Sequence, residues 1–434
     1  MLRPVLVRLD LRTSARVLFF GAGPAIFGLI VACGTEAPPR IVYVCPENHF
    51  CDLPPTAVEE PPPLDEPAPT PAPSPEPIPP YPAGTSVRLL QYGVVDAAQV
   101  RSTGALVVVS DTRELVVIDP LRRTEARSPL PSLPVALSVS NDGRLAAVGY
   151  AANVSLVDLA TRETIATCPA ASRIRDLAVD DAGIIHILSG RTPSDIDVLS
   201  RVDTDTCATS VVQSPVGQSG SLVLTGSGRT LYYQASDLYR CTFPAVFAPA
   251  TPAYCASLER NGTRFEECSG LWFDDTGRTL LTGCGQRFHP PAEATPDVFT
   301  APDGRIAEVE SIVSLAVSAA SDRILVLGHS RLGAPALRER ELATLHVYGA
   351  RTLQRVNRLG VPPFPASEGS AFGRGRFVFA DSTMQYAFVV MESADGRVAR
   401  SKFALATLPL YDGVLVDAGA PSTDAEVPDA ADAN

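Results

Sequence analysis

The chain has 434 residues, with 36 basic and 48 acidic side chains, a formal net charge of −12 and a hydrophobic content of 45%. This length suits two or three ordinary domains or one large repeat architecture. Lys402 is the only lysine. An acidic chain has no general affinity for phosphate backbones, so we expect no nucleic acid among its partners.

The acidity is concentrated at the ends of the chain. Residues 1–32 carry a net charge of +3, residues 33–87 carry eight acids and one arginine, and residues 412–434 carry six acids and no base. The remaining 324 residues have a net charge of −2. We therefore expect a nearly neutral folded body between two acidic segments.

The first 33 residues have the pattern of an export signal. A basic stretch ends at Arg16, and residues 17–32 are uncharged and mostly apolar before Cys33. A sixteen-residue helix covers about 24 Å, less than the ~30 Å hydrocarbon core of a membrane, and Gly23 and Pro24 interrupt it, so a permanent span is not expected. An ordinary cleaved signal or an uncleaved anchor would also have this pattern.

Residues 29–33, with the sequence LIVAC, resemble the lipobox of bacterial lipoproteins. The resemblance implies that residues 1–32 are a cleaved signal peptide and that the thiol of Cys33 carries lipid, which holds the protein on a membrane. Gly34 stands where many such lipoproteins have the Asp that retains them in the inner membrane. The resemblance therefore predicts export and anchoring at the bacterial outer membrane, on its periplasmic or its cell-surface face.

The number of cysteines agrees with this prediction, because nine thiols cannot all pair internally and eight can. Sequence proximity favours four disulfides: Cys45 with Cys51, Cys168 with Cys207, Cys241 with Cys255 and Cys268 with Cys284. The alternative is that some of the eight are buried thiols. No CxxC pair and no nearby histidine has the spacing of a zinc site, so we expect neither a metal nor another cofactor.

Residues 33–84 are predicted to form an extended acidic linker behind the lipid-bearing cysteine. Proline occupies 14 of the 31 positions from residue 54 to residue 84, a composition that favours polyproline geometry and cannot bury a core. A proline-rich stretch can also be a recognition ligand for aromatic grooves. The acidic tail, residues 412–434, is predicted to be disordered because it has too few apolar residues.

The segment 85–411 is predicted to be all-β. Short β-rich runs alternate with turns, and residues 135–168 show the unit most clearly. The first turn of each unit aligns at intervals of 40, 45, 49 and 45 residues on Gly143, Gly183, Gly228, Gly277 and Asp322. Four-stranded propeller blades have roughly this length. Seven units are expected, over residues 94–131, 133–169, 172–213, 218–259, 265–310, 311–360 and 370–410.

Seven four-stranded blades close into a ring when the two ends of the chain share a sheet. Residues 85–92 form a β-rich run before the first unit, and we expect this run to complete the last blade, with residues 414–416 as the competing candidate. Residues 153–167 resemble the YVTN-type β-propeller repeat, and residues 114–120 are similar. Asp158 and Asp119 end their strands in these segments and are expected to accept hydrogen bonds from turn amides.

The propeller layout can be compared with the cysteine pairs. Cys268 and Cys284 are equidistant from Thr276 and would face one another across a hairpin, unless a bulge at Gly277 shifts the register. Cys241 and Cys255 flank a connection between the third and fourth strands of a blade. Cys168 and Cys207 are expected one repeat apart, on the outer strands of neighbouring blades that diverge at the rim. This geometry neither favours nor excludes a bridge between them.

No sequence motif of a hydrolase, protease, nucleotide site or calcium loop is present. His186 and His346 lie in apolar runs and are expected to be core histidines with satisfied hydrogen bonds. Arginines that follow turns are expected to be solvated, or alternatively to form a basic ring; they are Arg144, Arg229, Arg278 and Arg397.

The interpretation we favour is a monomeric, membrane-anchored binding or scaffold propeller outside the cytoplasm, with a protein or a glycan as its partner. The alternative is a lactonase-like hydrolase that uses the central channel, because lactone hydrolases are found among seven-bladed propellers similar to this one. Function does not follow from fold, and no candidate catalytic residue emerges from the sequence.

Overall fold

The computed structural model describes residues 77–410 and three earlier stretches, 17–21, 27–31 and 41–44. Within 77–410 the description omits residues 171–172, 191–196, 217–219, 235–237, 244–253, 258–269, 291–301, 331–340, 367–368, 372 and 394–402. The chain divides into two compact units, residues 1–73 and 74–434. Cys33, Cys45, Cys51, most of the predicted linker and the acidic tail lie outside the described residues.

The first unit contains a three-stranded antiparallel sheet with the order β1 (Val17–Gly21), β2 (Phe27–Val31) and β3 (Ile41–Val44). A signal segment inserted in a membrane would be helical, whereas these residues, rich in Val, Ile and Phe, pair as strands. No helix among the described residues is long and apolar enough to cross a membrane. The signal peptide therefore remains a prediction.

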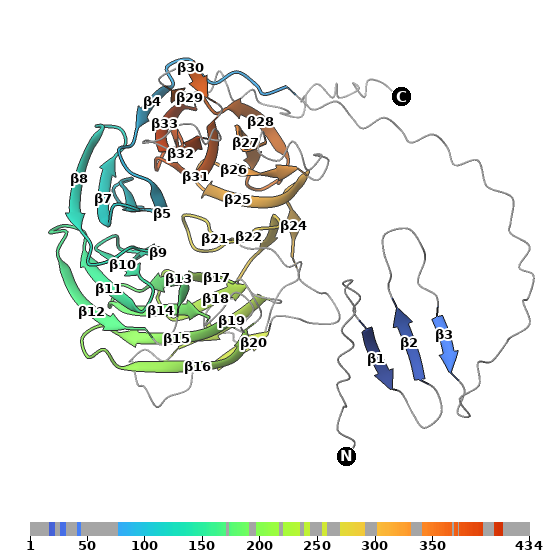
Figure 1. The fold of residues 1–434 in the computed structure, drawn as a ribbon. Coiled ribbons are helices and arrows are strands. Elements are labelled where there is room, and N and C mark those ends of the chain that lie inside the picture. Colours follow the sequence, from blue (N-terminus) through green and yellow to red (C-terminus); the bar gives the residue numbers. More distant parts are fainter. Residues whose placement is uncertain are drawn as a thin grey trace, which may run out of the picture. The chain divides into compact units, whose positions relative to one another are not determined.

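The second unit is a seven-bladed β-propeller, as the repeat predicted, and each blade is a four-stranded antiparallel sheet (Figure 1). Blades 1 to 3 consist of β5 (Val94–Gln99), β6 (Leu106–Ser110), β7 (Glu114–Asp119) and β8 (Thr124–Pro129); β9 (Ala136–Val139), β10 (Leu145–Gly149), β11 (Asn153–Asp158) and β12 (Thr164–Pro169); and β13 (Ile174–Val179), β14 (Ile184–Ser189), β15 (Asp197–Asp203) and β16 (Thr209–Val216).

Blades 4 to 6 consist of β17 (Ser221–Leu224), β18 (Thr230–Gln234), β19 (Leu238–Thr242) and β20 (Tyr254–Ser257); β21 (Leu271–Phe273), β22 (Leu280–Thr282), β23 (Gln286–Phe288) and β24 (Gly304–Arg305); and β25 (Val309–Ser318), β26 (Arg323–Ser330), β27 (Thr344–Gly349) and β28 (Arg355–Gly360). A hairpin of β29 (Phe364–Ala366) and β30 (Gly369–Ala371) precedes blade 7, which has the order β31 (Gly373–Ala380), β32 (Tyr386–Ser393), β33 (Phe403–Pro409) and β4 (Ser86–Leu89).

Burial along each blade explains why the apolar pattern changes from strand to strand. All residues of β6 and β10, the second strands of blades 1 and 2, are buried. The fourth strands, β8 and β12, are mostly exposed, and Cys168 is their one buried residue. A strand covered on both faces needs a continuous apolar run, and an outer strand does not. The buried apolar residues form seven clusters, one between each pair of neighbouring blades.

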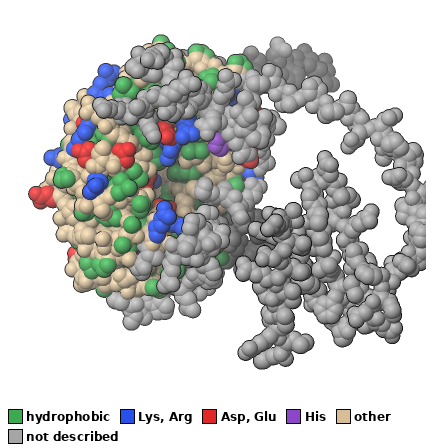
Figure 2. Space-filling view, viewed as in Figure 1, with side chains coloured by type: hydrophobic (Ala, Val, Ile, Leu, Met, Phe, Trp, Pro, Cys, Tyr) green, Lys and Arg blue, Asp and Glu red, His purple; other side chains and the backbone are tan. Residues whose placement is uncertain are grey.

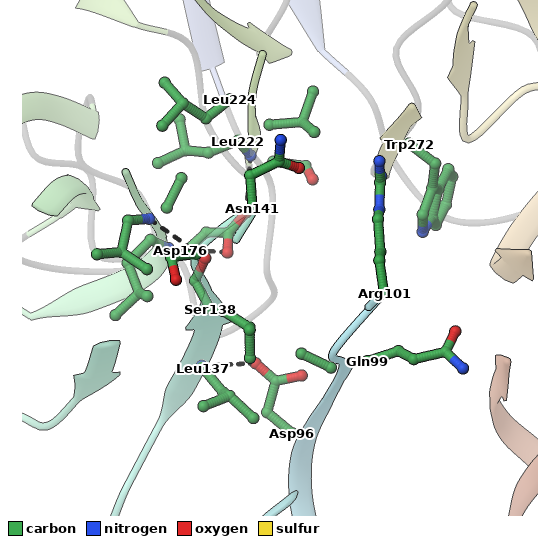
Figure 3. Close-up of a pocket in the computed structure, with 18 of the residues that line it drawn as sticks. Asp96, Gln99, Arg101, Leu137, Ser138, Asn141, Asp176, Leu222, Leu224 and Trp272 are labelled. Carbon is green, nitrogen blue, oxygen red and sulfur yellow. Dashed lines mark hydrogen bonds between the residues drawn. The ribbon is translucent and has the colours of Figure 1, made fainter. Parts of the chain in front are cut away.

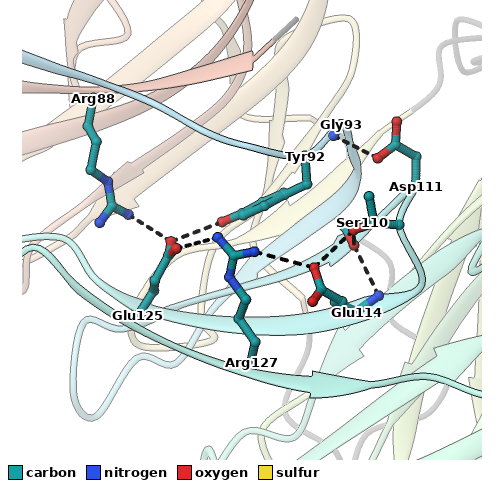
Figure 4. A network of polar contacts seen from close by, with 9 residues as sticks. Arg88, Tyr92, Gly93, Ser110, Asp111, Glu114, Glu125 and Arg127 are labelled. Carbon is teal, nitrogen blue, oxygen red and sulfur yellow. Dashed lines mark hydrogen bonds and ion pairs between the residues drawn. The ribbon is translucent and has the colours of Figure 1, made fainter. Parts of the chain in front are cut away.

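β4 pairs with β33 and so completes blade 7, which confirms the predicted closure by the run at residues 85–92. A polar network then ties β4 to blade 1 (Figure 4). Glu125 on β8 accepts hydrogen bonds from Arg88 at 3.3 Å, from Arg127 at 2.6 Å and from the hydroxyl of Tyr92 at 3.4 Å. Three donors on one carboxylate hold the two ends of the ring together.

The turn residues aligned from the sequence all lie between the first and second strands of a blade and all have a left-handed backbone conformation. The φ values are 76°, 83°, 71°, 69° and 51° for Gly143, Gly183, Gly228, Gly277 and Asp322. Glycine adopts this conformation without steric cost, and aspartate tolerates it, which explains why the repeat could be aligned on these positions.

The aspartates that end strands also lie as predicted. Asp158 accepts hydrogen bonds from the amides of Ala160 and Thr161, and Asp119 accepts them from the turn amides of Leu121 and Arg122. These carboxylates therefore stabilise turns.

Two predicted disulfides are present, Cys168–Cys207 and Cys241–Cys255, with Cα–Cα distances of 5.3 and 4.1 Å. The sequence predicted Cys207 on an outer strand, and this placement is wrong. Cys207 lies in the turn before β16 with φ of 55°, and this turn brings it to β12 of the neighbouring blade. Cys284 is disulfide-bonded as well, while Cys268, the partner that the sequence predicts, lies outside the described residues.

The hairpin register predicted around Cys284 is wrong by one residue. Leu271 pairs with Thr282, because the turn from residue 275 to residue 278 has four residues and centres the hairpin between Thr276 and Gly277. The pairing of Leu271 with Thr282 is therefore one residue out of the register that the sequence predicted.

Candidate functional site

The innermost strands of all seven blades surround a central cavity of about 410 Å³ (Figure 3). The face of the propeller is hollowed near its centre, with acidic, basic and apolar side chains around the depression (Figure 2). We call this cavity the channel. Its volume falls within the range of small-molecule sites, and polar and apolar groups both line it.

Among the four aspartates that line the channel, Asp96 and Asp176 lie on the innermost strands of alternate blades, 1 and 3. Asp96 on β5 accepts hydrogen bonds from the amides of Ala97 and of Leu137 in blade 2, both at 2.8 Å. Asp176 on β13 accepts them from Leu177 at 2.8 Å and from Leu222 in blade 4 at 2.7 Å. Each carboxylate therefore joins its own blade to the next one.

The surroundings favour the protonated form of both carboxylates. Burial raises the pKa of Asp96 to about 7, and the negative charge of Asp176 adds to this increase. Burial raises the pKa of Asp176 to about 6. Carboxylates with such raised pKa values often mark functional sites, but here the contacts with backbone amides also give them a structural role.

The same device recurs with a neutral side chain in blade 6. Ser314 on β25 accepts a hydrogen bond at 3.0 Å from the amide of Val378 in blade 7. Asp96, Asp176 and Ser314 each follow a register shift in the innermost strand. The sequence signal is a small polar residue three or four positions before the last residue of the innermost strand, and it is hard to recognise because its type differs from blade to blade.

One mouth of the channel is formed by the turns that follow the innermost strands. Arg101 donates to the carbonyl of Asp274 at 3.2 Å, which joins blade 1 to blade 5. Asn141 donates to the carbonyl of Gly226 at 3.4 Å, which joins blade 2 to blade 4. A second cavity of about 290 Å³ shares residues with the channel, including Arg101 and Trp272.

Of the two histidines predicted to be core residues, His186 is buried and His346 is partly buried, and the expected hydrogen bonds are not all made. His186 on β14 is fully buried against Phe243, with ring centroids 4.6 Å apart, and neither of its ring nitrogens has a hydrogen-bond partner. Burial lowers the pKa of His186 to about 3, and the nearby charge of Arg201 lowers it further. Burial likewise lowers the pKa of His346 to about 4.

The described turn arginines do not form a basic ring at the channel. Arg144, Arg229 and Arg278 are all exposed, as expected for solvated turn residues, and Arg144 forms an ion pair with Asp142. Arg397 lies outside the described residues. Within the part of the chain that the structure describes, no group of three or more His, Cys, Asp and Glu side chains is placed to hold a metal ion.

Comparison with known proteins supports the fold and goes no further. No family model matches the chain, and no curated protein matches it. Among solved structures, the β-propeller domain of Cps50 (Swd1) from Myceliophteria thermophila is similar, with a TM-score of 0.56 and 13% sequence identity. The match covers 75% of this chain and the whole of that domain.

Proposed function

We propose that this protein is a lipid-anchored binding scaffold that works outside the cytoplasm, where its propeller presents a rigid surface to a protein or glycan partner. The observation that carries the proposal is the disulfide between blades 2 and 3, Cys168–Cys207, together with the second bridge, Cys241–Cys255. Disulfides persist mainly in oxidising compartments, so their presence supports export.

The anchor in this proposal is Cys33, at the end of the lipobox-like segment, and Gly34 favours the outer membrane. Residues 54–79 of the proline-rich segment would extend to about 80 Å in polyproline geometry, enough to hold the propeller clear of the lipid headgroups. The described chain continues from this segment at Pro77, and the amide of Gly360 on β28 donates to the carbonyl of Pro80 at 3.1 Å. This contact supports a fixed point of attachment on blade 6.

Binding is better supported than hydrolysis, the alternative considered from the sequence. Asp96, Asp176 and Asp180, three of the aspartates that line the channel, each accept hydrogen bonds from two backbone amides, which is the geometry of a structural element. A hydrolase would need a base free to take a proton from water. A panel of lactones, assayed with chelated and with metal-loaded protein, tests the alternative, and turnover in either state would support it.

The anchor is tested by replacing Cys33 with serine and following the protein by cell fractionation. We expect the variant C33S to leave the membrane fraction, while a matched control, Thr35→Ser, stays with the outer membrane. Retention of C33S on membranes as tight as that of the parent would contradict the anchor. Free-thiol labelling of the exported protein gives a second measurement, because unprotected Cys168 and Cys207 would contradict an oxidising location.

A further inference from the structure

Trp272 places an aromatic side chain at the channel. It lies on β21, the innermost strand of blade 5, is only partly buried, and lines both the channel and the adjoining cavity of about 290 Å³. Part of the indole packs on the apolar cluster between blades 5 and 6. The indole is therefore held in place while another part borders the open space (Figure 3).

Two hydrogen-bond donors line the channel with this indole: Arg101 lies beside it, and Asn141 lies farther away (Figure 3). Arg101 uses one N–H to bond the carbonyl of Asp274, and a guanidinium carries five N–H groups. Asn141 donates at 3.4 Å to Gly226, a long contact that a better acceptor would replace. Both side chains project from turns at the same mouth and are labelled together with Trp272 in Figure 3.

Hydrogen-bond acceptors lie deeper in the same cavity. Each carboxylate oxygen has two lone pairs, and each oxygen of Asp96 accepts one backbone amide. Asp176 is arranged in the same way and also takes a hydrogen bond from the side chain of Ser221. Acceptor positions therefore remain on Asp96 toward the channel.

These three kinds of group match one class of ligand. A pyranose ring has apolar C–H faces that stack on an indole and a rim of hydroxyl groups that both donate and accept hydrogen bonds. A charged ligand fits less well. A sugar acid would meet the carboxylates of Asp176 and Asp275, and an amine would meet the guanidinium of Arg101 at the mouth.

We propose that the mouth of the channel beside Trp272 binds a neutral hexopyranose unit of a glycan. This inference rests on the proposed binding function and names its ligand class. The ring would stack on Trp272, and Arg101 and Asn141 would donate to its hydroxyls. Asp96 lies five residues before Arg101, about 16 Å deeper along the strand, and would accept from a hydroxyl of an adjoining sugar unit.

Trp272 is the only tryptophan of the chain, so tryptophan fluorescence reports on this site alone. The full-length protein is titrated with methyl β-glucoside, methyl α-mannoside, methyl β-galactoside and N-acetylglucosamine, with glycerol as a control for solvent effects. We expect at least one of these sugars to change the emission in a saturable way and to protect Trp272 from acrylamide quenching. Glycerol should do neither.

Variants separate binding from folding. Arg101→Gln should weaken sugar binding about tenfold, because a charged donor is lost. The control is Arg122→Gln, because the side chain of Arg122 is 84% exposed on an outer turn, and this variant should bind as the parent does. Trp272→Phe, measured by calorimetry, should also weaken binding. Unchanged thermal unfolding midpoints show that these variants are folded, and Asn141→Ala replaces Arg101→Gln if that variant does not fold.

Three results would overturn the proposal. They are the absence of a saturable emission change with every neutral sugar, tighter binding of glucuronate than of the glucoside, and parental affinity in a folded Arg101→Gln or Asn141→Ala variant. The assay uses purified protein and does not depend on the lipid. A negative result therefore leaves the anchor at Cys33 standing, and a failed anchor leaves the sugar site standing.

Discussion

Replacing Asp96 with asparagine should remove a dependence of stability on pH that the buried carboxylate creates. The pKa of Asp96 is about 7 in the folded protein, against an ordinary value of 3.8. A group whose pKa is raised by folding binds its proton more tightly in the folded state. Its contribution is therefore fully present below pH 3.8 and is lost as the pH rises through about 7.

The size of this effect follows from the difference between the two pKa values. A rise from 3.8 to about 7 corresponds to about 4 kcal/mol of free energy of unfolding. Asp96 lines the channel, so solvent in the channel reduces this value, and we expect about 2 kcal/mol. Asparagine cannot ionise and keeps one of the two amide contacts, which costs about 1 kcal/mol at every pH.

The assay is denaturant unfolding of the parent and of Asp96→Asn at several pH values between about 4 and 8, the range over which the contribution of Asp96 is lost. His186 and His346 act in the opposite direction, because their lowered pKa values remove stability as the pH falls, but they cancel in the difference between the two proteins. Asp158→Asn is the control, since its pKa is lowered and its effect should be constant over this range.

The variant should be the less stable protein near pH 4 and should match or exceed the parent near pH 8. A difference between Asp96→Asn and the parent that stays the same across the range would refute the reasoning. It would mean that the carboxylate ionises freely in the folded protein.

Three further predictions concern the frame of the propeller. Cys207→Ser should lower the free energy of unfolding by about 4 kcal/mol, because the bridge closes a loop with a sequence separation of 39. Reducing the Cys168–Cys207 bridge of the parent should have the same effect. Equal stability of Cys207→Ser and the oxidised parent in denaturant unfolding would argue against this contribution of the bridge. Glu125→Gln should lower the free energy of unfolding by about 1–2 kcal/mol, because three donors lose their charged acceptor. The control Glu163→Gln, at an exposed position, should have no measurable effect on thermal unfolding. Equal thermal unfolding midpoints for Glu125→Gln and the parent would contradict the network. Between pH 7 and pH 4.5, the stability of His186→Leu relative to the parent should increase by on the order of 2 kcal/mol, because the buried imidazole of the parent stays neutral while the imidazole of its unfolded state is charged. The same stability difference at pH 7 and at pH 4.5 would show that His186 is free to protonate.

The architecture could be predicted from the sequence because its signals are local. A turn residue with positive φ recurs from blade to blade and is usually glycine, as at Gly143 and Gly228, and an aspartate that bonds turn amides, such as Asp158, ends a strand. These constraints act within a few residues and leave a visible period. The closing strand was also predictable, because a β-rich run left over at the start of the chain has one open sheet to join.

The channel could not be predicted, because its residues are brought together by the closure of the ring. Asp96 and Asp176 are 80 positions apart and look like ordinary polar residues of strands. Only the packing of neighbouring blades shows that each accepts an amide from the next blade. Arg101 and Trp272 lie near one another for the same reason.

Other details depended on one residue more or less in a turn. The turn at residues 275–278 has four residues, so the hairpin register differs by one residue from the predicted one. The turn before β16 brings Cys207 to the neighbouring blade. His186 shows a different limit, because its burial follows from its apolar surroundings in the sequence, whereas the absence of hydrogen-bond partners for its ring does not.

Closure of the ring by β4 is tested most directly with one engineered disulfide. Val87 and Ala406 are directly paired across β4 and β33, so the double variant Val87→Cys, Ala406→Cys should form a bridge between these positions in the folded, oxidised protein. Peptide mass spectrometry should identify this bridge, and the variant should unfold at a higher temperature than the parent. Two thiols that remain free for labelling in the folded variant would contradict the closed seven-bladed ring.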